Sequence, residues 1–340
     1  MINKIKTSKL DYKLPKRSIK QNPYKIRDQS KILNAHTKEI IKFSNLLHFI
    51  PHNSTLVINT TSVQKVRIHA KKKYTEGKVE IFILKVLDHR TFQCLIKTNT
   101  TKAANQIFYI QKTEMSIIDR TGQLFTVRLL NSDCKTLISE YGTMPLPPYI
   151  EDSINKHKSY QTEFANGGFS VAAPTAGLHF TNKLINEIKQ KGVKVLNINL
   201  NVGLGTFSSI KTNFVHEHKI HNEEYTIQKS IAKELQIDKN NNRKIICIGT
   251  TSLRAIETCF KSEIPNTEGE TNLFIQRGYK FRFANGLITN FHAPKSSLLA
   301  IIDTLLHDEW LNIYNYALNS GLYFLSFGDS MYIDIDKCRT

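Results

Sequence analysis

The segment 168–181, which reads Gly-Phe-Ser-Val-Ala-Ala-Pro-Thr-Ala-Gly-Leu-His-Phe-Thr, combines small residues with one imidazole. Small residues leave a backbone that a ligand can approach closely, and His179 is the one side chain here that titrates near neutral pH. A helix is predicted over 182–191, with Thr181 as its N-cap and Gly192 at its C-terminus. The pattern is typical either of a loop that brings an imidazole to a ligand site or of a tight structural turn with a packed histidine.

Two further loops join a predicted strand to a predicted helix and have the same character. They are 249–254, Gly-Thr-Thr-Ser-Leu-Arg, and 290–296, Asn-Phe-His-Ala-Pro-Lys-Ser. In α/β folds, ligands bind beyond the carboxyl ends of strands, where helix N-termini offer free N–H groups to a carboxylate or phosphate. With 174–179, which we expect to be a third such junction, these loops predict a composite pocket. Its candidate binding residues are Pro174, Thr175, Gly177, Thr250, Thr251, Ser252, Arg254, Asn290 and Lys295.

A glycine-spaced turn and a histidine-rich segment follow the strand predicted at 193–200. The turn, 201–207, contains Gly203, Gly205 and Thr206, and the segment 216–224 reads His-Glu-His-Lys-Ile-His-Asn-Glu-Glu. Its first two histidines share a face of a strand, and its last two share a face of a helix. A metal site is one interpretation, but no aspartate or thiolate lies close by in the sequence. Acid–base or hydrogen-bonding work and a solvated polar turn are the alternatives.

The charge balance indicates a polyanionic partner. The 340 residues carry a formal net charge of +18, which attracts nucleic acid, although a compositional bias toward lysine would produce the same charge. Five scattered cysteines without a Cys-x-x-Cys pair are typical of free thiols in a reducing cytosol. No apolar run approaches the ~18 residues of a membrane span, and no signal peptide is expected. Neither a Rossmann nor a Walker A glycine motif is present.

The domain organisation follows from a change in the predicted secondary structure along the chain. From about 64 to 148 the sequence consists of short β-rich segments, which predict a small antiparallel barrel or sandwich that ends in a proline-dense linker. Lys71, Lys72 and Lys73 lie on its first predicted hairpin, where they would contact phosphates or form an ordinary solvated face. From 160 onward, strands and helices alternate, which favours an α/β domain.

The motifs together resemble those of the S-adenosylmethionine:tRNA ribosyltransferase-isomerases of queuosine biosynthesis. The likeness is densest in 170–181 and continues in order along nearly the whole chain, which makes it far more specific than any single motif. The other matching segments are 11–15, 27–28, 77–80, 144–150, 160–162, 202–207, 217–223, 249–254, 278–279, 287–292, 294–296 and 327–329.

The resemblance implies a fold and a reaction. The fold is α/β, with a large α/β domain from both chain ends, 1–63 and 149–340, and a small antiparallel β-barrel domain inserted at 64–148. The ribosyl part of S-adenosylmethionine moves to the aminomethyl group of a 7-deazaguanine at the tRNA wobble position and is rearranged to give epoxyqueuosine, with release of adenine and methionine. S-adenosylmethionine is consumed as a substrate, and no metal or other cofactor is expected. We expect a cytoplasmic monomer that binds tRNA and no membrane.

The resemblance also suggests roles for particular residues. The sulfonium acidifies the neighbouring C5′ protons, so a positioned base is required. Candidates for the base are His179, His218 and His221, with Glu223 as an orienting group or an alternative base, and His292 is the candidate acid for adenine departure. The helix N-terminus at 250–252 would hold the methionine carboxylate. Asn290 and Asp329 would bind ribose hydroxyls or the amine.

The sequence departs from the family pattern at a few positions, which keeps other functions open. After the first strand the family has Asn-Asp-Thr-Arg, and this chain has Asn-Thr-Thr-Ser at 59–62. Arg277 replaces a proline, and Ala293 replaces a leucine. One alternative is therefore a tRNA-binding relative without catalysis. Another is a metal-dependent hydrolase whose ligands are His216, His218 and His221.

Overall fold

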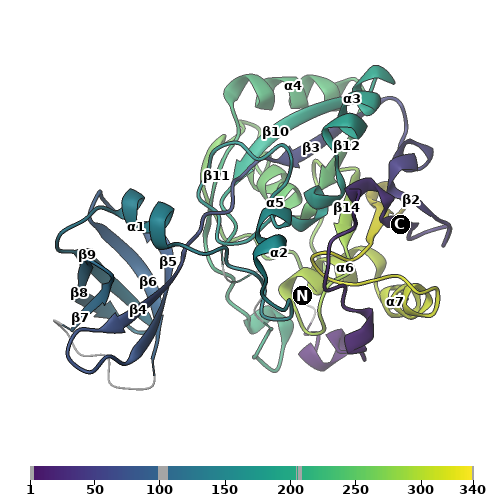
Figure 1. Ribbon diagram of the computed structural model, residues 1–340. Helices are drawn as coiled ribbons and strands as arrows, with labels where there is room; N and C mark the ends of the chain where they lie inside the picture. The colour runs from purple at the N-terminus through teal and green to yellow at the C-terminus, as the bar shows by residue number, and fades with distance from the viewer. Residues whose placement is uncertain (1–3, 99–105, 204, 206–208, 339–340) are drawn as a thin grey trace. The chain divides into compact units, whose positions relative to one another are not determined.

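The computed structural model describes residues 4–98, 106–203, 205 and 209–338. The chain divides into two compact units, one formed by 1–62 with 147–340 and the other by 63–146 (Figure 1). The predicted fold class is confirmed. The larger unit is an α/β domain built on a nine-stranded sheet, and the inserted segment forms a closed antiparallel barrel. No helix in the described ranges is long and apolar enough to cross a membrane.

The smaller unit is a six-stranded barrel in the order β4-β5-β6-β9-β8-β7. Its strands are β4 (Arg67–Lys72), β5 (Lys78–Val86), β6 (Thr91–Lys97), β7 (Ile107–Ile110), β8 (Thr113–Thr121) and β9 (Leu124–Leu129). Alternate residues point into the barrel, as Ile68 and Ala70 do in β4. A short helix that the sequence did not predict, α1 (Cys134–Tyr141), follows the last strand and is capped by Asp133.

The three lysines of the first hairpin do not form a uniform basic patch. Lys71 pairs with Glu76 at 3.0 Å, and Lys73 pairs with Glu114 at 2.8 Å. Lys72, on the opposite face of the strand, is buried with 4% of its surface exposed. The two-residue period of a strand turns Lys72 into the barrel, and its burial speaks against a phosphate contact at this position.

The larger unit is built on a nine-stranded sheet in the order β13-β11-β10-β3-β12-β14-β15-β1-β2. The four central strands, β10, β3, β12 and β14, are mutually parallel, and β15 runs antiparallel to β14. The sequence predicted these four but missed the short outer strands. The strands are β1 (Lys31–Asn34), β2 (Ile40–Lys42), β3 (Ser54–Asn59), β10 (Lys194–Leu200), β11 (Glu223–Thr226), β12 (Lys244–Ile248), β13 (Glu268–Thr271), β14 (Gly286–Asn290) and β15 (Ser330–Asp334).

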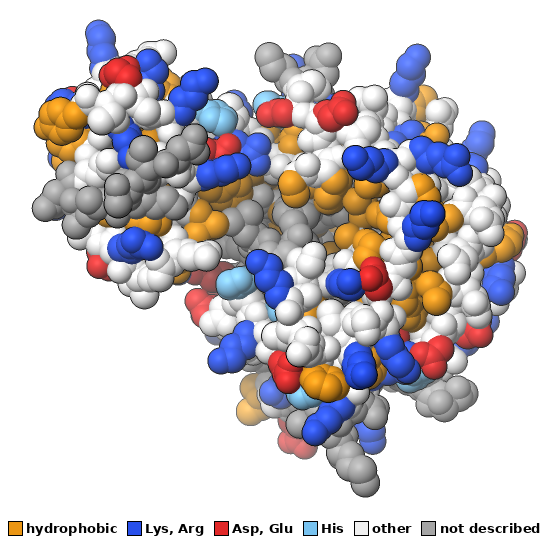
Figure 2. Space-filling view, turned by 90° about the horizontal axis from the view of Figure 1, so that it is seen from below, with side chains coloured by type: hydrophobic (Ala, Val, Ile, Leu, Met, Phe, Trp, Pro, Cys, Tyr) orange, Lys and Arg blue, Asp and Glu red, His pale blue; other side chains and the backbone are white. Residues whose placement is uncertain are grey.

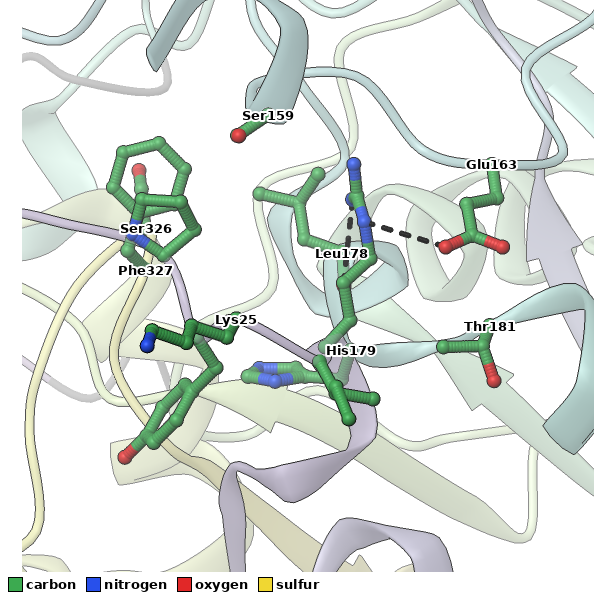
Figure 3. A pocket seen from close by; sticks show the side chains of 12 residues that line it. Lys25, Ser159, Glu163, Leu178, His179, Thr181, Ser326 and Phe327 are labelled. Atoms are coloured by element: carbon green, nitrogen blue, oxygen red, sulfur yellow. Dashed lines mark hydrogen bonds and ion pairs between the residues drawn. The ribbon is translucent and has the colours of Figure 1, made fainter. Parts of the chain in front are cut away.

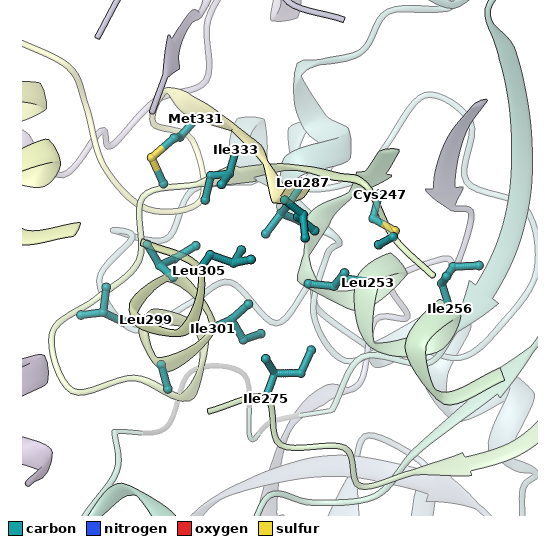
Figure 4. Close-up of a cluster of buried hydrophobic side chains, with 14 of the residues drawn as sticks. Cys247, Leu253, Ile256, Ile275, Leu287, Leu299, Ile301, Leu305, Met331 and Ile333 are labelled. Atoms are coloured by element: carbon teal, nitrogen blue, oxygen red, sulfur yellow. The ribbon is translucent and has the colours of Figure 1, made fainter. Parts of the chain in front are cut away.

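Helices cover both faces of the central sheet because its strands are apolar on both sides. In β3, Leu56 and Ile58 pack with the apolar side of α3, whereas Val57 packs with α4, α5, α6 and α7 on the other face. Figure 4 shows part of this second cluster, including Leu253 and Leu287. The helices are α2 (Ile154–Ser159), α3 (Asn182–Gln190), α4 (Lys229–Asn240), α5 (Gly249–Cys259), α6 (Ser297–Leu306) and α7 (Glu309–Asn319).

Short 3₁₀ helices connect the regular elements. The predicted cap of α3 is confirmed, since the Thr181 hydroxyl accepts a 3.1 Å hydrogen bond from the Leu184 N–H, and Gly192 after the helix has a φ of 86°. The 3₁₀ helices are η1 (Thr7–Leu10), η2 (Lys16–Ser18), η3 (Arg27–Gln29), η4 (Phe43–His48), η5 (Thr175–His179), η7 (Val215–Glu217) and η8 (Ile335–Cys338).

Two junctions differ from the prediction. The segment 174–179 does not join a strand to a helix; it forms η5 after a stretch of irregular chain. Helix α5 begins at Gly249, four residues earlier than predicted, so 250–252 form its first turn rather than a loop. The positive φ of 84° at Gly249 allows the chain to turn directly from β12 into this helix.

The loop 59–62 is held by a dense set of hydrogen bonds. The Thr61 hydroxyl lies 2.7 Å from the Ser170 hydroxyl, and the Ser62 N–H donates to the Gly167 carbonyl at 2.7 Å. Gly168 has a φ of 73°, and a Cβ there would lie 2.5 Å from the Thr61 hydroxyl. The loop that departs from the family pattern is therefore fixed against the segment that carries η5.

We expect Gly168→Ala to destabilise the larger unit by about 2–5 kcal/mol, because it combines a left-handed backbone with overpacking. Gly167→Ala is a matched control, since Gly167 has a φ of 77° but nothing within 4 Å of its Cβ position, and should cost about 1–2 kcal/mol. Trp310, the single tryptophan, is buried in α7, so its fluorescence during urea unfolding reports on this unit. Equal losses in the two variants would contradict the packing argument.

Candidate active site

The ends of the central strands bring polar residues to one edge of the sheet. Ile248 of β12 pairs with Ile58 of β3 on one side and with Ile288 of β14 on the other. The residues that follow these three strands therefore lie at the same edge of the sheet. Asn290 at the end of β14 lies opposite Ser330 at the start of β15. The loops before β15 and β1 therefore meet this edge as well, as expected for a ligand site in an α/β sheet.

His179, at the end of η5, is fixed in this edge by two hydrogen bonds. Its Nε2 lies 3.2 Å from the Asn290 side-chain amide nitrogen, which donates, and its Nδ1 lies 2.7 Å from the Ser30 hydroxyl. This pairing places the ring proton on Nδ1. The ring also stacks on Phe43, with 5.0 Å between centroids. Segments from three distant parts of the sequence therefore determine the orientation and tautomer of one imidazole.

Burial keeps this imidazole neutral. His179 is 4% exposed, and burial, followed by the nearby Arg27 charge, lowers the pKa of His179 to about 3. At pH 7 the side chain therefore carries no charge and acts as a hydrogen-bonding group with a fixed direction.

A pocket of about 240 Å³ opens beside His179. Figure 3 shows the side chains of His179, Glu163 and Ser326 around it. One side of the pocket is formed by residues 23–27, and another by the end of η5 and the residue Thr181 that follows it. The lining residues are Pro23, Tyr24, Lys25, Ile26, Arg27, Ser159, Glu163, Leu178, His179, Thr181, Ser326 and Phe327.

Three buried polar atoms near the same edge have no hydrogen-bond partner among the described residues. They are the Asn290 Oδ1 and the hydroxyls of Thr251 and Ser252 in the first turn of α5. Buried polar atoms are nearly always paired with protein, water or ligand. Three such atoms at the strand ends are therefore suited to bind polar groups of a substrate. Asn290, Thr251 and Ser252 keep their predicted place as candidate binding residues.

Glu223 and Arg254 form a buried ion pair, which gives both a structural role. The Arg254 Nη1 contacts the Glu223 Oε2, and the Arg254 Nε donates to the Leu273 carbonyl at 2.9 Å. The other Glu223 oxygen accepts from the Gly203 N–H at 2.8 Å. With these partners, Glu223 is not available as a base and Arg254 is not available to a substrate. The pair instead holds the glycine turn against α5 and β11.

The histidine-rich segment places two imidazoles beside the glycine turn. A Cβ at Gly205 would lie 2.9 Å from the His221 ring, so the backbone of the turn touches it. His218 is partly buried and packs edge-on against Phe274, and burial, with His221 nearby, lowers the pKa of His218. Thr206 lies outside the described residues. Among the residues that are described, no group of His, Cys, Asp or Glu could hold a metal ion, which removes the support for a site built on His216.

His292 does not have the properties of an acid. It is 7% exposed, its Nε2 lies 2.9 Å from the Thr289 hydroxyl, and burial lowers the pKa of His292 to about 3. The side chain is therefore unprotonated at pH 7. Its backbone N–H is not free to donate to a substrate either, since it donates to the Tyr314 hydroxyl at 3.1 Å.

Lys295 and Asp329 are also engaged within the protein. Lys295 pairs with Asp11 at 2.6 Å. Asp329 is fully buried and accepts hydrogen bonds from the Tyr24 hydroxyl and from the N–H groups of Lys31 and Tyr323. Asp329 therefore fastens the N-terminal segment to the sheet edge, which supports a positioning role. The Lys295 N–H also donates to the Leu10 carbonyl at 2.8 Å, whereas its side chain, 41% exposed, stays a candidate for ligand contact.

In η5, Pro174 and Thr175 begin the turn, and Gly177 is packed against its neighbours. A Cβ at Gly177 would lie 2.8 Å from the Phe164 ring, so glycine is required by close packing rather than by a ligand. Pro174 and Thr175 are not among the residues that line the pocket. The functional residue of this segment is thus its histidine.

Comparison with known proteins identifies the family. The model of the family described as queuosine biosynthesis protein matches residues 7–333. The chain belongs to this family. The resemblance found in the sequence is therefore confirmed.

Relatives named S-adenosylmethionine:tRNA ribosyltransferase-isomerase match this family member over nearly its full length. The protein from Fusobacterium nucleatum is 38% identical, with 96% of each chain covered. The one from Sulfurihydrogenibium is 37% identical over 97% of this chain and 100% of the relative. A solved structure, the S-adenosylmethionine tRNA ribosyltransferase from Thermotoga maritima, is 26% identical, with a TM-score of 0.54 over 96% of this chain and 100% of that one.

Sequence reasoning missed several residues of the site in this family member. Ser30 follows no motif that singles it out, and Arg27 was noted only as part of a matching dipeptide. Glu163 lies just after the matching segment 160–162. These residues become visible only when the fold brings 23–30 and 159–163 beside η5.

We expect the stability of the protein to fall as the pH drops from about 6.5 toward 3. The unfolded chain protonates His179 near pH 6.5, whereas the native state protonates it only near pH 3, so each such histidine costs about 1.4 kcal/mol per pH unit in this window. His179→Gln should reduce the slope of the unfolding free energy against pH by about one proton. An unchanged slope between pH 4 and 6 would contradict the burial argument.

We expect Arg254→Met to destabilise the larger unit by about 3–5 kcal/mol, because it leaves the buried Glu223 charge without its partner. The double variant with Arg254→Met and Glu223→Gln should recover part of the lost free energy of unfolding, because it no longer buries an unpaired charge. Lys183→Met is the control, since Lys183 is 84% exposed in its pair with Glu187 and should change stability by no more than about 0.5 kcal/mol. Urea unfolding followed by Trp310 fluorescence measures all three, and a loss under 1 kcal/mol for Arg254→Met would refute the structural role.

Proposed function

We propose that this chain transfers the ribosyl moiety of S-adenosylmethionine to 7-aminomethyl-7-deazaguanine at the wobble position of tRNA and isomerises it. The products are epoxyqueuosine in tRNA, adenine and methionine. Family membership over nearly the whole chain supports this activity. The observation that carries it in the structure is the polar strand edge, where the neutral His179 and three unpartnered buried polar atoms lie together.

The polar edge suits the chemistry of S-adenosylmethionine. A neutral imidazole does not repel a sulfonium, whereas a protonated one would. The oxygen of Asn290 and the hydroxyls of Thr251 and Ser252 are hydrogen-bonding groups of the kind that ribose hydroxyls and adenine nitrogens require. We propose that S-adenosylmethionine binds here as a substrate and that the reaction uses no metal or other cofactor.

For the base that removes the C5′ proton, we propose His218, with His221 as its partner. His218 is partly buried and its pKa is lowered, so it is neutral at pH 7 and can accept a proton. Removal of this proton forms an ylide, in which the adjacent sulfonium stabilises the carbanion. The glycine turn beside His221 lets the substrate approach closely. The two ring nitrogens of His179 are both engaged, so His179 instead positions Asn290, whose Oδ1 is open to the substrate.

The partner RNA fits the charge of the chain. The formal net charge is +18, and Figure 2 shows lysine and arginine side chains spread over one face of the protein. We propose that these side chains supply the sequence-independent part of tRNA binding. Lys71 and Lys73 remain candidates for phosphate contact, since both lysine side chains are exposed and ion pairs at the surface are weak in water. We propose a cytoplasmic monomer as the working state.

The direct test is an incubation of the protein with S-adenosylmethionine and an anticodon stem-loop that carries 7-aminomethyl-7-deazaguanine. We expect adenine release in step with the mass gain of the RNA. A protein that binds the RNA but gives neither signal would instead be a relative without catalysis, with the loop at 59–62 as the first suspect, because it lacks the acid and the arginine of the family pattern.

We expect His218→Ala to lower kcat by about 10²- to 10⁴-fold, the usual effect of losing a general base. His179→Ala should instead raise the KM for S-adenosylmethionine, because it removes a positioning group. His48→Ala is the control, since His48 is an exposed imidazole paired with Glu39 away from the pocket lining. Full turnover by His218→Ala would exclude this residue as the base.

A further inference from the structure

The pocket beside His179 contains a cation and a carboxylate that are only loosely paired. The Arg27 Nε lies 3.6 Å from the Glu163 Oε1, and the Arg27 Nη1 lies 3.4 Å from the Leu178 carbonyl. Strong charge-assisted hydrogen bonds are nearer 2.7–2.9 Å. In Figure 3 one of the dashed lines ends at the labelled Glu163 and marks the longer of these two contacts. Each charge therefore keeps capacity for another partner.

Free capacity remains on both groups. A guanidinium has five N–H donors, and the Arg27 Nη2 has no hydrogen-bond partner among the described residues, so it is available to a ligand. The second Glu163 oxygen accepts from the Asn182 N–H at 2.8 Å, but a carboxylate offers about four lone-pair sites. The side chains are 19% and 33% exposed, so they are shielded from bulk water but reachable from the pocket.

A cation and an anion side by side form the complement of a zwitterion. The α-carboxylate of an amino acid matches the guanidinium, and its α-ammonium matches the carboxylate. An isolated anion, such as a phosphate, would be repelled by Glu163. The pocket volume of about 240 Å³ is below the roughly 300–1,000 Å³ of sites that enclose a whole drug-sized ligand. The pocket is therefore of a size to hold one end of a larger molecule.

Building on the proposed function, we propose that Arg27 and Glu163 bind the amino-acid end of S-adenosylmethionine, with the carboxylate on Arg27 and the ammonium on Glu163. His179 lines the same pocket and bonds to Asn290, so a ligand anchored here extends past the imidazole toward the strand edge. This assignment moves the methionine carboxylate away from the first turn of α5, where we expected it from the sequence. None of Thr250, Thr251 and Ser252 lines this pocket.

The test compares two nucleosides that differ in the amino-acid end. S-adenosylhomocysteine has it, and 5′-methylthioadenosine lacks both of its charges. Isothermal titration calorimetry measures both dissociation constants for the wild type, Arg27→Ala and Glu163→Gln. Glu163→Gln keeps an acceptor oxygen for the Asn182 N–H, so α3 remains capped. Glu187→Gln is the matched control, because Glu187 lies in an exposed pair with Lys183.

We expect the wild type to prefer S-adenosylhomocysteine, and Arg27→Ala and Glu163→Gln each to weaken its binding by about 10- to 100-fold, the effect of losing a hydrogen bond to a charged group. Binding of 5′-methylthioadenosine should not change, and Glu187→Gln should bind both as the wild type does. The inference alone is overturned if the variants weaken the binding of both nucleosides equally, or if they weaken the binding of neither. It is also overturned if Arg27→Ala weakens the binding of the RNA but not that of S-adenosylhomocysteine. If the wild type binds neither nucleoside, the proposed function fails and the inference fails with it.

Discussion

The parallel register of the central sheet is the constraint on which the site depends. Because β3, β12 and β14 end together, the loop 59–62, the start of α5 and Asn290 meet at one edge. The reversal of β15 then returns the chain so that Asp329 and, through β1, Ser30 reach the same place. A one-residue slip in the register of β14 would turn Asn290 to the other face of the sheet.

The charged residues of the site fall into two classes with different consequences. Arg254 with Glu223, and Asp329 with its three donors, are buried and fully engaged, so they hold the surrounding loops in place. Arg27 and Glu163 are partly exposed and separated by a long contact. Burial raises the cost of leaving a charge unpaired, so the engaged groups stabilise the fold while the looser ones remain open to a ligand.

The sequence predicted the layout of the fold because hydrophobic periodicity and turn residues report local structure. The central strands, the cap at Thr181 and the barrel tract were all found in this way. The edge strands were missed, since segments such as β1 and β13 are only four residues long. Residue types in motifs located the polar edge, but they did not distinguish a buried ion pair such as Arg254–Glu223 from a free catalytic group, because partners are set by tertiary packing. Ser30 and Arg27 were overlooked for the same reason.

The central claim is that the substrate binds at the polar strand edge of the larger unit. A crystal structure of the protein with S-adenosylhomocysteine tests it most directly. We expect polar atoms of the nucleoside within hydrogen-bond distance of the Asn290 Oδ1 and the Thr251 hydroxyl, which lack partners without it. A nucleoside bound elsewhere, with these atoms still unpaired, would contradict the account.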